Sequence, residues 1–270
     1  MTDRMDRWMA ALEARQLADL TFPEVSRSLR ALSSTYVERR ATLKEGAALT
    51  GAGKRAAFAL FYGPLHFLLV RHIVAALGAP FTTVDRLLDL GCGTGAAGAG
   101  WAVACPRAPQ VTGIDRHAWA IEEARRTYGD LGLHATLRMD DMTRVAFPTA
   151  ETAGRSPRGA TALGARPEAD RRRSGVLLAF AVNEVADAKD RNALLTRLLD
   201  HAGSGGHLVV IEPLAGFVAP WWKDWQRAFE SAGGRADEWR VRIPLPLIVE
   251  KLDRAAGLNH RELKGRTLAI

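Results

Sequence analysis

The residues best suited to binding a small ligand lie in a glycine-rich segment, Leu87-Leu-Asp-Leu-Gly-Cys-Gly-Thr-Gly95. In this segment Asp89 precedes three alternating glycines, which are Gly91, Gly93 and Gly95. Glycine lets the backbone approach a ligand closely and adopt dihedral angles that other residues avoid. The helix expected next begins with N–H groups that have no partner within the helix and are free to bind a ligand. The segment therefore predicts a ligand-binding loop between a strand and a helix.

The motif is compatible with two classes of cofactor, dinucleotides and S-adenosylmethionine. The run Gly93-Thr-Gly95-Ala-Ala-Gly98 also fits the G-x-G-x-x-G pattern of dinucleotide-binding proteins. A pyrophosphate would be repelled by the carboxylate of Asp89, whereas S-adenosylmethionine carries a sulfonium and an ammonium group and no phosphate. The charge of Asp89 therefore favours S-adenosylmethionine over NAD.

Acidic residues also end the next two predicted strands. Asp115 is placed to accept hydrogen bonds from both ribose hydroxyls of a nucleoside, a role that S-adenosylmethionine and NAD share. In the run Asp140-Asp141-Met142, Asp141 is placed to accept a hydrogen bond from an adenine amino group. Because parallel strands end at one edge of a sheet, these acids would lie near the glycine loop. The alternative is that they cap the helices that follow.

Strands and helices alternate from Val84 onward, which predicts an α/β fold with a parallel sheet and helices on both faces. The run Val176–Val182 is continuously apolar, as expected of a central strand buried on both faces. The predicted strands are Val84–Leu90, Gln110–Asp115, His134–Met139, Val176–Val182, His207–Ile211, Trp239–Ile243 and Glu262–Ile270. The predicted helices lie near Ala96–Ala104, Ala118–Tyr128, Lys189–His201, Trp221–Ala232 and Leu247–Ala256.

The domain organisation predicted from the chain is a helical cap over residues 1–80 and a cofactor-binding domain over 81–270. Residues 149–174 are rich in Gly, Pro, Ala and Arg and predict a flexible insertion, since they lack the apolar side chains needed to form a core. The most apolar stretch, Ala56–Leu77, contains Pro64, His66, Arg71 and His72. A charge near the centre of a bilayer costs about 3 kcal/mol, so this stretch predicts a buried helix rather than a membrane span.

With the glycine loop, Asp115 and Asp141, the chain resembles class I S-adenosylmethionine-dependent methyltransferases over about Val84 to Ile270. The resemblance implies a Rossmann-like, seven-stranded, mostly parallel sheet whose last strand runs antiparallel. It also implies that Gly91, Gly93 and Gly95 line the methionine part of the cofactor, Asp115 its ribose and Asp141 its adenine.

Three short segments resemble a narrower family, the ribosomal small-subunit methyltransferase-like proteins of mitochondria and bacteria. They are Tyr36-x-x-Arg39-Arg40-Ala-Thr42, Phe180-Ala-Val-Asn183-Glu184 and Val210-Ile-Glu212-Pro213. This resemblance implies a partner in the small ribosomal subunit. The chain departs from the family in lacking the cysteine cluster that often holds an iron–sulfur centre.

The fourth strand of the class I fold ends beside the transferred methyl group, which makes Asn183 and Glu184 the catalytic candidates. Methyl transfer needs mainly proximity and alignment, with an acid–base group where the acceptor must lose a proton. Asn183 could accept a hydrogen bond from an amino acceptor, and Glu184 could orient or deprotonate it. The alternative is that they bind the N-terminus of the next helix, where Asp187 is typical of a cap.

Three further residues are candidates for contact with the acceptor. Arg39 and Arg40 could contact phosphates, or they could lie on a solvated helix face. Trp221 could stack on a base if it were exposed, although packing against the sheet, together with Trp225 on the same helix face, is the alternative.

The composition fits a soluble protein with a polyanionic partner. The formal net charge is +7, which allows binding to RNA without requiring it. The two cysteines, Cys92 and Cys105, form neither a disulfide framework nor a metal-binding pair, so we expect no metal site and a reducing, cytoplasmic location. We therefore expect a methyltransferase acting on ribosomal RNA or another ribosome-associated target. The alternatives are a non-catalytic assembly factor that keeps the fold and a methyltransferase of small molecules.

Overall fold

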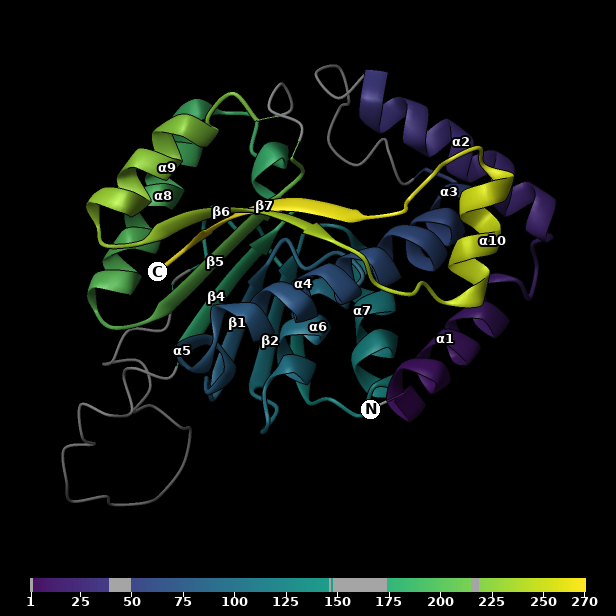
Figure 1. Cartoon of the computed structure of the whole chain (residues 1–270), viewed down its shortest axis with the longest axis horizontal. Coiled ribbons are helices and arrows are strands. Elements are labelled where there is room, and N and C mark those ends of the chain that lie inside the picture. Colours follow the sequence, from purple (N-terminus) through teal and green to yellow (C-terminus); the bar gives the residue numbers. More distant parts are fainter. Residues whose placement is uncertain (1, 39–49, 146, 148–173, 215–218) are drawn as a thin grey trace.

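The central element of the computed structural model is a seven-stranded sheet (Figure 1). The structure describes residues 2–38, 50–145, 147, 174–214 and 219–270. The strand order is β3-β2-β1-β4-β5-β7-β6, with β1 to β5 parallel and β7 antiparallel to both of its neighbours. This confirms the predicted fold class. The strands are β1 (Arg86–Leu90), β2 (Gln110–Asp115), β3 (Ala135–Met139), β4 (Ser174–Ala179), β5 (His207–Glu212), β6 (Arg235–Val241) and β7 (Leu263–Ala269).

Helices cover both faces of the sheet, as the alternation of elements predicts. In the described part of the chain they are α1 (Thr2–Gln16), α2 (Phe22–Glu38), α3 (Ala52–Ala57), the π-helical turn η3 (Phe58–Tyr62), α4 (Gly63–Leu77), α5 (Ala79–Thr82), α6 (Ala96–Ala104), α7 (Ala118–Asp130), the 3-10 turn η6 (Val182–Glu184), α8 (Ala188–Gly203), α9 (Trp222–Ser231) and α10 (Leu247–Ala255). Figure 1 shows α8 and α9 together on one side of the sheet and α2, α3 and α10 gathered at the other end of the molecule.

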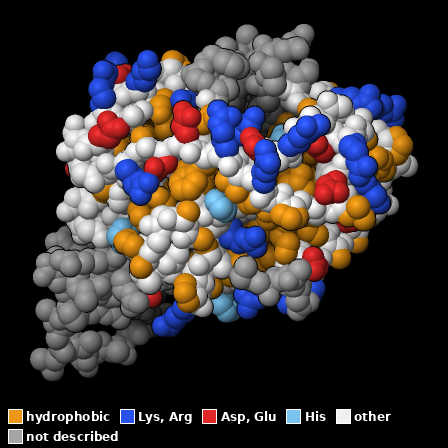
Figure 2. Space-filling model, viewed as in Figure 1, with side chains coloured by type: hydrophobic (Ala, Val, Ile, Leu, Met, Phe, Trp, Pro, Cys, Tyr) orange, Lys and Arg blue, Asp and Glu red, His pale blue; other side chains and the backbone are white. Residues whose placement is uncertain are grey.

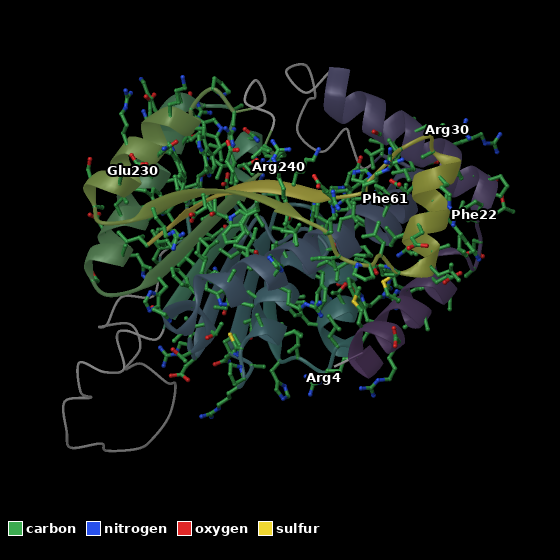
Figure 3. All side chains as sticks on the ribbon, viewed as in Figure 1. Arg4, Phe22, Arg30, Phe61, Glu230 and Arg240 are labelled. Carbon is green, nitrogen blue, oxygen red and sulfur yellow. The ribbon has the colours of Figure 1, made fainter. Side chains whose placement is uncertain are left out.

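The central strand β4 shows how the sequence fills the two faces. Its side chains alternate, so that Leu177 and Ala179 join the core beneath α4 and α6, while Val176 and Leu178 join the core beneath α8 and α9. Five of its six residues are buried. Figure 3 shows side chains between the sheet and the helices that cover it.

Strand β4 ends earlier than the apolar run that predicted it. The backbone turns at Phe180, which has a positive φ of 60°, and Val182 begins the 3-10 turn η6. Apolar residues continue through this turn because they still face the core, so hydrophobicity alone does not mark the end of the strand. Strand β6 begins at Arg235, before the predicted start at Trp239, because its polar first half is held by pairing with β7.

The N-terminal residues are helical, as predicted, and they share one hydrophobic core with the sheet. Helices α4 and α6 touch so closely that a Cβ on Gly100 would lie 2.5 Å from the carbonyl oxygen of Phe67. Helix α1 is tied to α7, because Arg15 donates hydrogen bonds to Glu123 at 2.8 Å and to Asp130 at 3.0 Å. The N-terminal helices are therefore packed as part of the same body as the sheet.

The helical stretch Ala52–Leu77 is long and apolar enough to cross a membrane by length and composition. Its most apolar window has a mean hydropathy of 1.5, and 61% of that window is buried inside the fold. Burial of this kind is what the sequence predicts for a core helix. The absence of a membrane partner stays a prediction.

Candidate functional site

The glycine loop after β1 has one open position and two that are closed by packing. Gly91, Gly93 and Gly95 all have positive φ, at 69°, 52° and 76°, a region that side chains disfavour. A Cβ on Gly91 would lie 2.6 Å from that of Ala181, and one on Gly95 would lie 2.8 Å from a ring carbon of Tyr128. A Cβ on Gly93 would meet nothing within 4 Å. The loop therefore presents bare backbone to open space at Gly93.

Asp115 joins this open position to the end of β2. One carboxylate oxygen accepts a hydrogen bond from the Gly93 N–H at 2.8 Å, and the other accepts one from the His117 N–H at 2.8 Å. A carboxylate has about four acceptor positions, so each oxygen can take a further donor such as a hydroxyl. Asp115 thus shapes the loop and still has capacity toward a ligand there, while its predicted contact with ribose stays a prediction.

Asp89 is placed differently from what its charge suggested. Its side chain is 1% exposed and points between β1, α6 and α7, where one oxygen accepts a hydrogen bond from the Tyr128 hydroxyl at 3.2 Å. The other oxygen has no hydrogen-bond partner among the described residues. Burial, with a smaller contribution from Asp115, raises the pKa of Asp89 to about 7.

The burial of Asp89 weakens the charge-based preference for S-adenosylmethionine over NAD. A carboxyl with that pKa is partly neutral near pH 7, and Gly98 leaves the space that it fills inside the fold. Asp89 therefore lies on the interior side of the loop, next to Tyr128 and Gly98. Asp115 and Asp141, by contrast, are partly exposed at this edge.

Asp141 forms a turn after β3 rather than a helix cap. One of its oxygens accepts hydrogen bonds from the Thr143 N–H at 2.8 Å and from the Thr143 hydroxyl at 2.7 Å. Burial alone would raise the pKa of Asp141, but these bonds and the nearby Arg116 and Arg144 lower it. Asp141 is thus a charged acceptor at the predicted edge, and its contact with adenine stays a prediction.

Just after β4, Asn183 lies at the centre of a partly buried polar network that sequence spacing did not predict. The Trp221 indole N–H donates to the Asn183 side-chain oxygen at 2.9 Å, and the Asn183 amide donates to Glu212 at 2.6 Å. Glu212 is fully buried, whereas Glu184 is exposed. Since Asn183 already has protein partners at both ends of its amide, its structural role is evident, and catalysis by Asn183 or Glu184 stays a prediction. Asp187 caps α8, as predicted.

The candidates for acceptor contact fall into two groups. The ring of Trp221 is only 7% exposed and lies 4.8 Å from that of Trp225, centroid to centroid. This agrees with packing against the sheet, and a substrate contact by Trp221 stays a prediction. Arg39 and Arg40, like nearly all of the predicted insertion at 149–174, lie outside the described residues.

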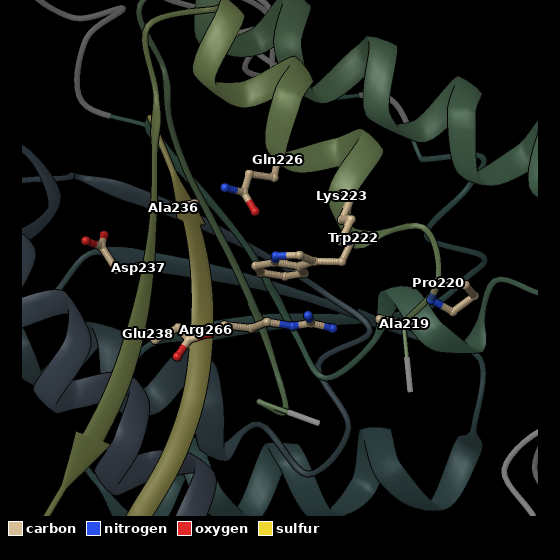
Figure 4. A pocket seen from close by; sticks show the side chains of 9 residues that line it. All are labelled: Ala219, Pro220, Trp222, Lys223, Gln226, Ala236, Asp237, Glu238 and Arg266. Atoms are coloured by element: carbon tan, nitrogen blue, oxygen red, sulfur yellow. The ribbon is translucent and has the colours of Figure 1, made fainter. Parts of the chain in front are cut away.

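A cavity of about 570 Å³ lies beside this network, between α9 and strands β6 and β7 (Figure 4). Arg266 extends along it under the ring of Trp222, with the guanidinium carbon 4.1 Å from the ring centroid. Burial lowers the pKa of Arg266, while Glu212 and Glu238 on the neighbouring strands act in the opposite direction. The cavity is lined by Ala219, Pro220, Trp222, Lys223, Gln226, Ala236, Asp237, Glu238 and Arg266.

An aromatic contact on the other side of β4 was also missed from the sequence. His66 of α4 stacks on Phe180 with ring centroids 4.0 Å apart. The two residues come from α4 and the end of β4, so no local spacing could pair them. The only sequence signal is the concentration of aromatic residues in Phe58–Tyr62.

On the face drawn in Figure 2, basic and acidic side chains of the described residues are interspersed. Figure 2 shows Lys and Arg side chains across the visible face with acidic side chains between them, and apolar side chains near its middle. Within the described part of the chain, no group of three or more His, Cys, Asp or Glu side chains is placed to hold a metal ion.

One protein-family model matches part of the chain. Residues 87–153 match the model of a methyltransferase domain, which covers the glycine loop, Asp115 and Asp141. This match supports the resemblance to the class I superfamily, and no finding bears on the narrower ribosomal family. No curated protein sequence matches the chain.

Several solved structures are similar at low identity. The mitomycin 7-O-methyltransferase MmcR is 15% identical, with 97% of this chain and 71% of that chain covered and a TM-score of 0.48. The O-methyltransferase NcsB1 from neocarzinostatin biosynthesis, in complex with S-adenosylmethionine, is 16% identical, with 96% and 73% covered and a TM-score of 0.47. Magnesium protoporphyrin IX methyltransferase from Synechocystis PCC 6803 is 12% identical, with 93% and 97% covered and a TM-score of 0.44.

Proposed function

We propose that this protein binds S-adenosylmethionine at the glycine loop and is a methyltransferase. The observation that carries the proposal is the open position at Gly93, whose N–H is held by Asp115 at the adjoining strand end. The match of residues 87–153 to a methyltransferase domain supports it. Both observations concern the same edge of the sheet.

The residues at this edge fit such a cofactor. Gly93 offers backbone and free space, Asp115 offers acceptor capacity for hydroxyl donors, and Asp141 offers a charged acceptor at the next strand end. When bound, S-adenosylmethionine supplies an electrophilic methyl group. The chain's own contribution is to hold the loop, to position the acceptor and to keep the end of β4 rigid through the Asn183 network.

For the acceptor we propose two candidates in different classes. The first is RNA of the small ribosomal subunit or another ribosome-associated target, which the narrower family resemblance and the net charge of +7 favour. The second is a small molecule, which the stacked rings of His66 and Phe180 favour. A non-catalytic assembly factor would share the fold and the RNA partner but would transfer no methyl group. We further propose a cytoplasmic location.

Calorimetric titration of the purified protein tests the proposal. S-adenosylmethionine should bind the wild-type protein, and Asp115→Ala should weaken it, because the substitution removes the acceptor and releases the Gly93 N–H. NADH serves as the competing ligand and should not bind. Binding of NADH alone, or no binding of S-adenosylmethionine by folded protein, would reject the proposal.

A further inference from the structure

Four partly exposed aromatic side chains form a cluster at the edge of the sheet. They are Phe58 and Tyr62 of η3, His66 of α4 and Phe180 at the end of β4, and we call them the aromatic cluster. His66 and Phe180 are nearly parallel, at 18°, with centroids 4.0 Å apart. Phe58 lies 5.9 Å from Tyr62 and 6.2 Å from His66, again between centroids, and Tyr62 also lies 6.2 Å from His66.

The chain neighbours of these residues contact the glycine loop at two points. Gly63, next to Tyr62, is close enough to the loop that a Cβ there would lie 3.5 Å from the Thr94 hydroxyl. Ala181, next to Phe180, fills the space beside Gly91. The aromatic cluster therefore adjoins the loop that we propose binds the cofactor.

Two uncommon backbone features hold the rings in this place. The segment Phe58–Tyr62 is a π-helical turn inside an otherwise α-helical stretch, a feature that is rare and frequent at functional sites. Phe180 has a φ of 60°, and it is the only residue other than glycine with positive φ in the described chain. Such a conformation is strained and persists only where the surroundings enforce it. Here the Phe180 N–H is fixed by the Ile211 carbonyl at 2.8 Å.

The π-helical turn gives this segment two different faces. Phe61, labelled in Figure 3, is fully buried and packs against His260 at 5.2 Å. Phe58 and Tyr62 stay partly exposed. Each of these two rings packs against the core on one side and leaves the rest of its surface accessible, so the cluster offers ring surface beside the loop.

We propose that the aromatic cluster is the binding subsite for the methyl acceptor and that the acceptor presents a planar aromatic ring there. Stacked and edge-to-face contacts with rings are what this surface offers. Its four side chains include no carboxylate, lysine or arginine, so what they offer a ligand is mainly ring surface. The proposal rests on the proposed methyltransferase function. A ring of this kind belongs either to a free aromatic molecule or to an unpaired base of RNA.

The test measures ring binding by protein saturated with S-adenosylhomocysteine. The probes are 2-naphthol, as a free ring, and a short single-stranded RNA of mixed sequence. Phe180→Gly removes the ring and suits the positive φ, so the backbone keeps its conformation. Phe180→Tyr keeps the ring, and Phe22→Leu, a partly buried aromatic on α2, is the control.

We expect the wild-type protein to bind at least one probe and Phe180→Gly to weaken that binding roughly fivefold to hundredfold, the range for a lost stacking contact. Phe180→Tyr should retain it, Phe22→Leu should not affect it, and all should bind S-adenosylhomocysteine as the wild type does. If Phe180→Gly weakens the binding of 2-naphthol only, the acceptor is a free aromatic molecule. If it weakens the binding of RNA only, the acceptor is an unpaired base. No binding of either probe, or equal binding by Phe180→Gly, would overturn the subsite. Failure of the wild type to bind S-adenosylhomocysteine would instead reject the proposed function, whatever the rings do.

Discussion

Replacing Gly93 with alanine separates the ligand-facing role of the glycine loop from its role in folding. The new Cβ would meet no protein atom within 4 Å, so no steric clash destabilises the fold. The remaining cost is the left-handed backbone at a φ of 52°, about 1–2 kcal/mol for a residue with a side chain. For a chain of this size each kcal/mol lowers the melting temperature by about 2–4 °C.

Gly132 supplies the matched control. It has a φ of 63° and open space around its Cβ position, so alanine there carries the same backbone cost. It lies in the turn between α7 and β3, at the edge of the sheet opposite the glycine loop. Gly132→Ala should therefore lower the melting temperature as Gly93→Ala does and leave ligand binding unchanged.

The two variants are compared by thermal unfolding and by titration with S-adenosylmethionine. We expect similar melting temperatures and a loss of affinity only in Gly93→Ala, because its methyl group occupies the space next to the bare backbone. The loss should be at least tenfold, equivalent to about 1.4 kcal/mol. Equal affinity in both variants would refute the assignment of Gly93 to the cofactor site.

Three further predictions follow from buried groups. The folded-state pKa of Asp89 is raised from 3.8 to about 7, so the folded protein holds a proton that the unfolded chain releases between about pH 4 and pH 7. The unfolding free energy should therefore fall by on the order of 4 kcal/mol as the pH rises through this range, and the contribution of Asp89 should not change further above it. Asp89→Asn should remove this fall in denaturant titrations, and an unchanged pH profile would contradict the burial of a neutral carboxyl. Asn183→Ala removes the donor to the buried Glu212 carboxylate and should cost about 1–3 kcal/mol in urea unfolding; a neutral effect would show that the network is not formed. Burial raises the pKa of the Cys92 and Cys105 thiols, so a thiol reagent at mildly alkaline pH should react slowly with native protein and rapidly once it unfolds, and fast reaction of native protein would contradict their burial.

The sequence predicts the sheet well because its signals are local. Apolar runs separated by amphipathic helices define the parallel strands, and the glycine loop marks where the first strand ends. The bounds of β2 and α6 agree residue for residue with the prediction. The boundary of β4 was missed because burial continues past Phe180, where the backbone leaves the strand.

The site was only partly predictable because its contacts are not local. The burial of Asp89 depends on α6 and α7 packing over β1, which residue types alone do not show, and its part in cofactor binding stays a prediction. Asn183, Glu212 and Trp221 come from three separate segments, and their hydrogen bonds exist only once the strands are aligned. Residue types could therefore indicate the ligand class but not which polar groups the fold itself uses.

A crystal structure of the protein grown with S-adenosylhomocysteine would test the central claim most directly. We predict that the ligand lies over the bare backbone at Gly93, with its ribose hydroxyls on Asp115. Density for the ligand at another place, or an empty loop in crystals of protein that binds the ligand in solution, would contradict the assignment of this edge of the sheet as the cofactor site.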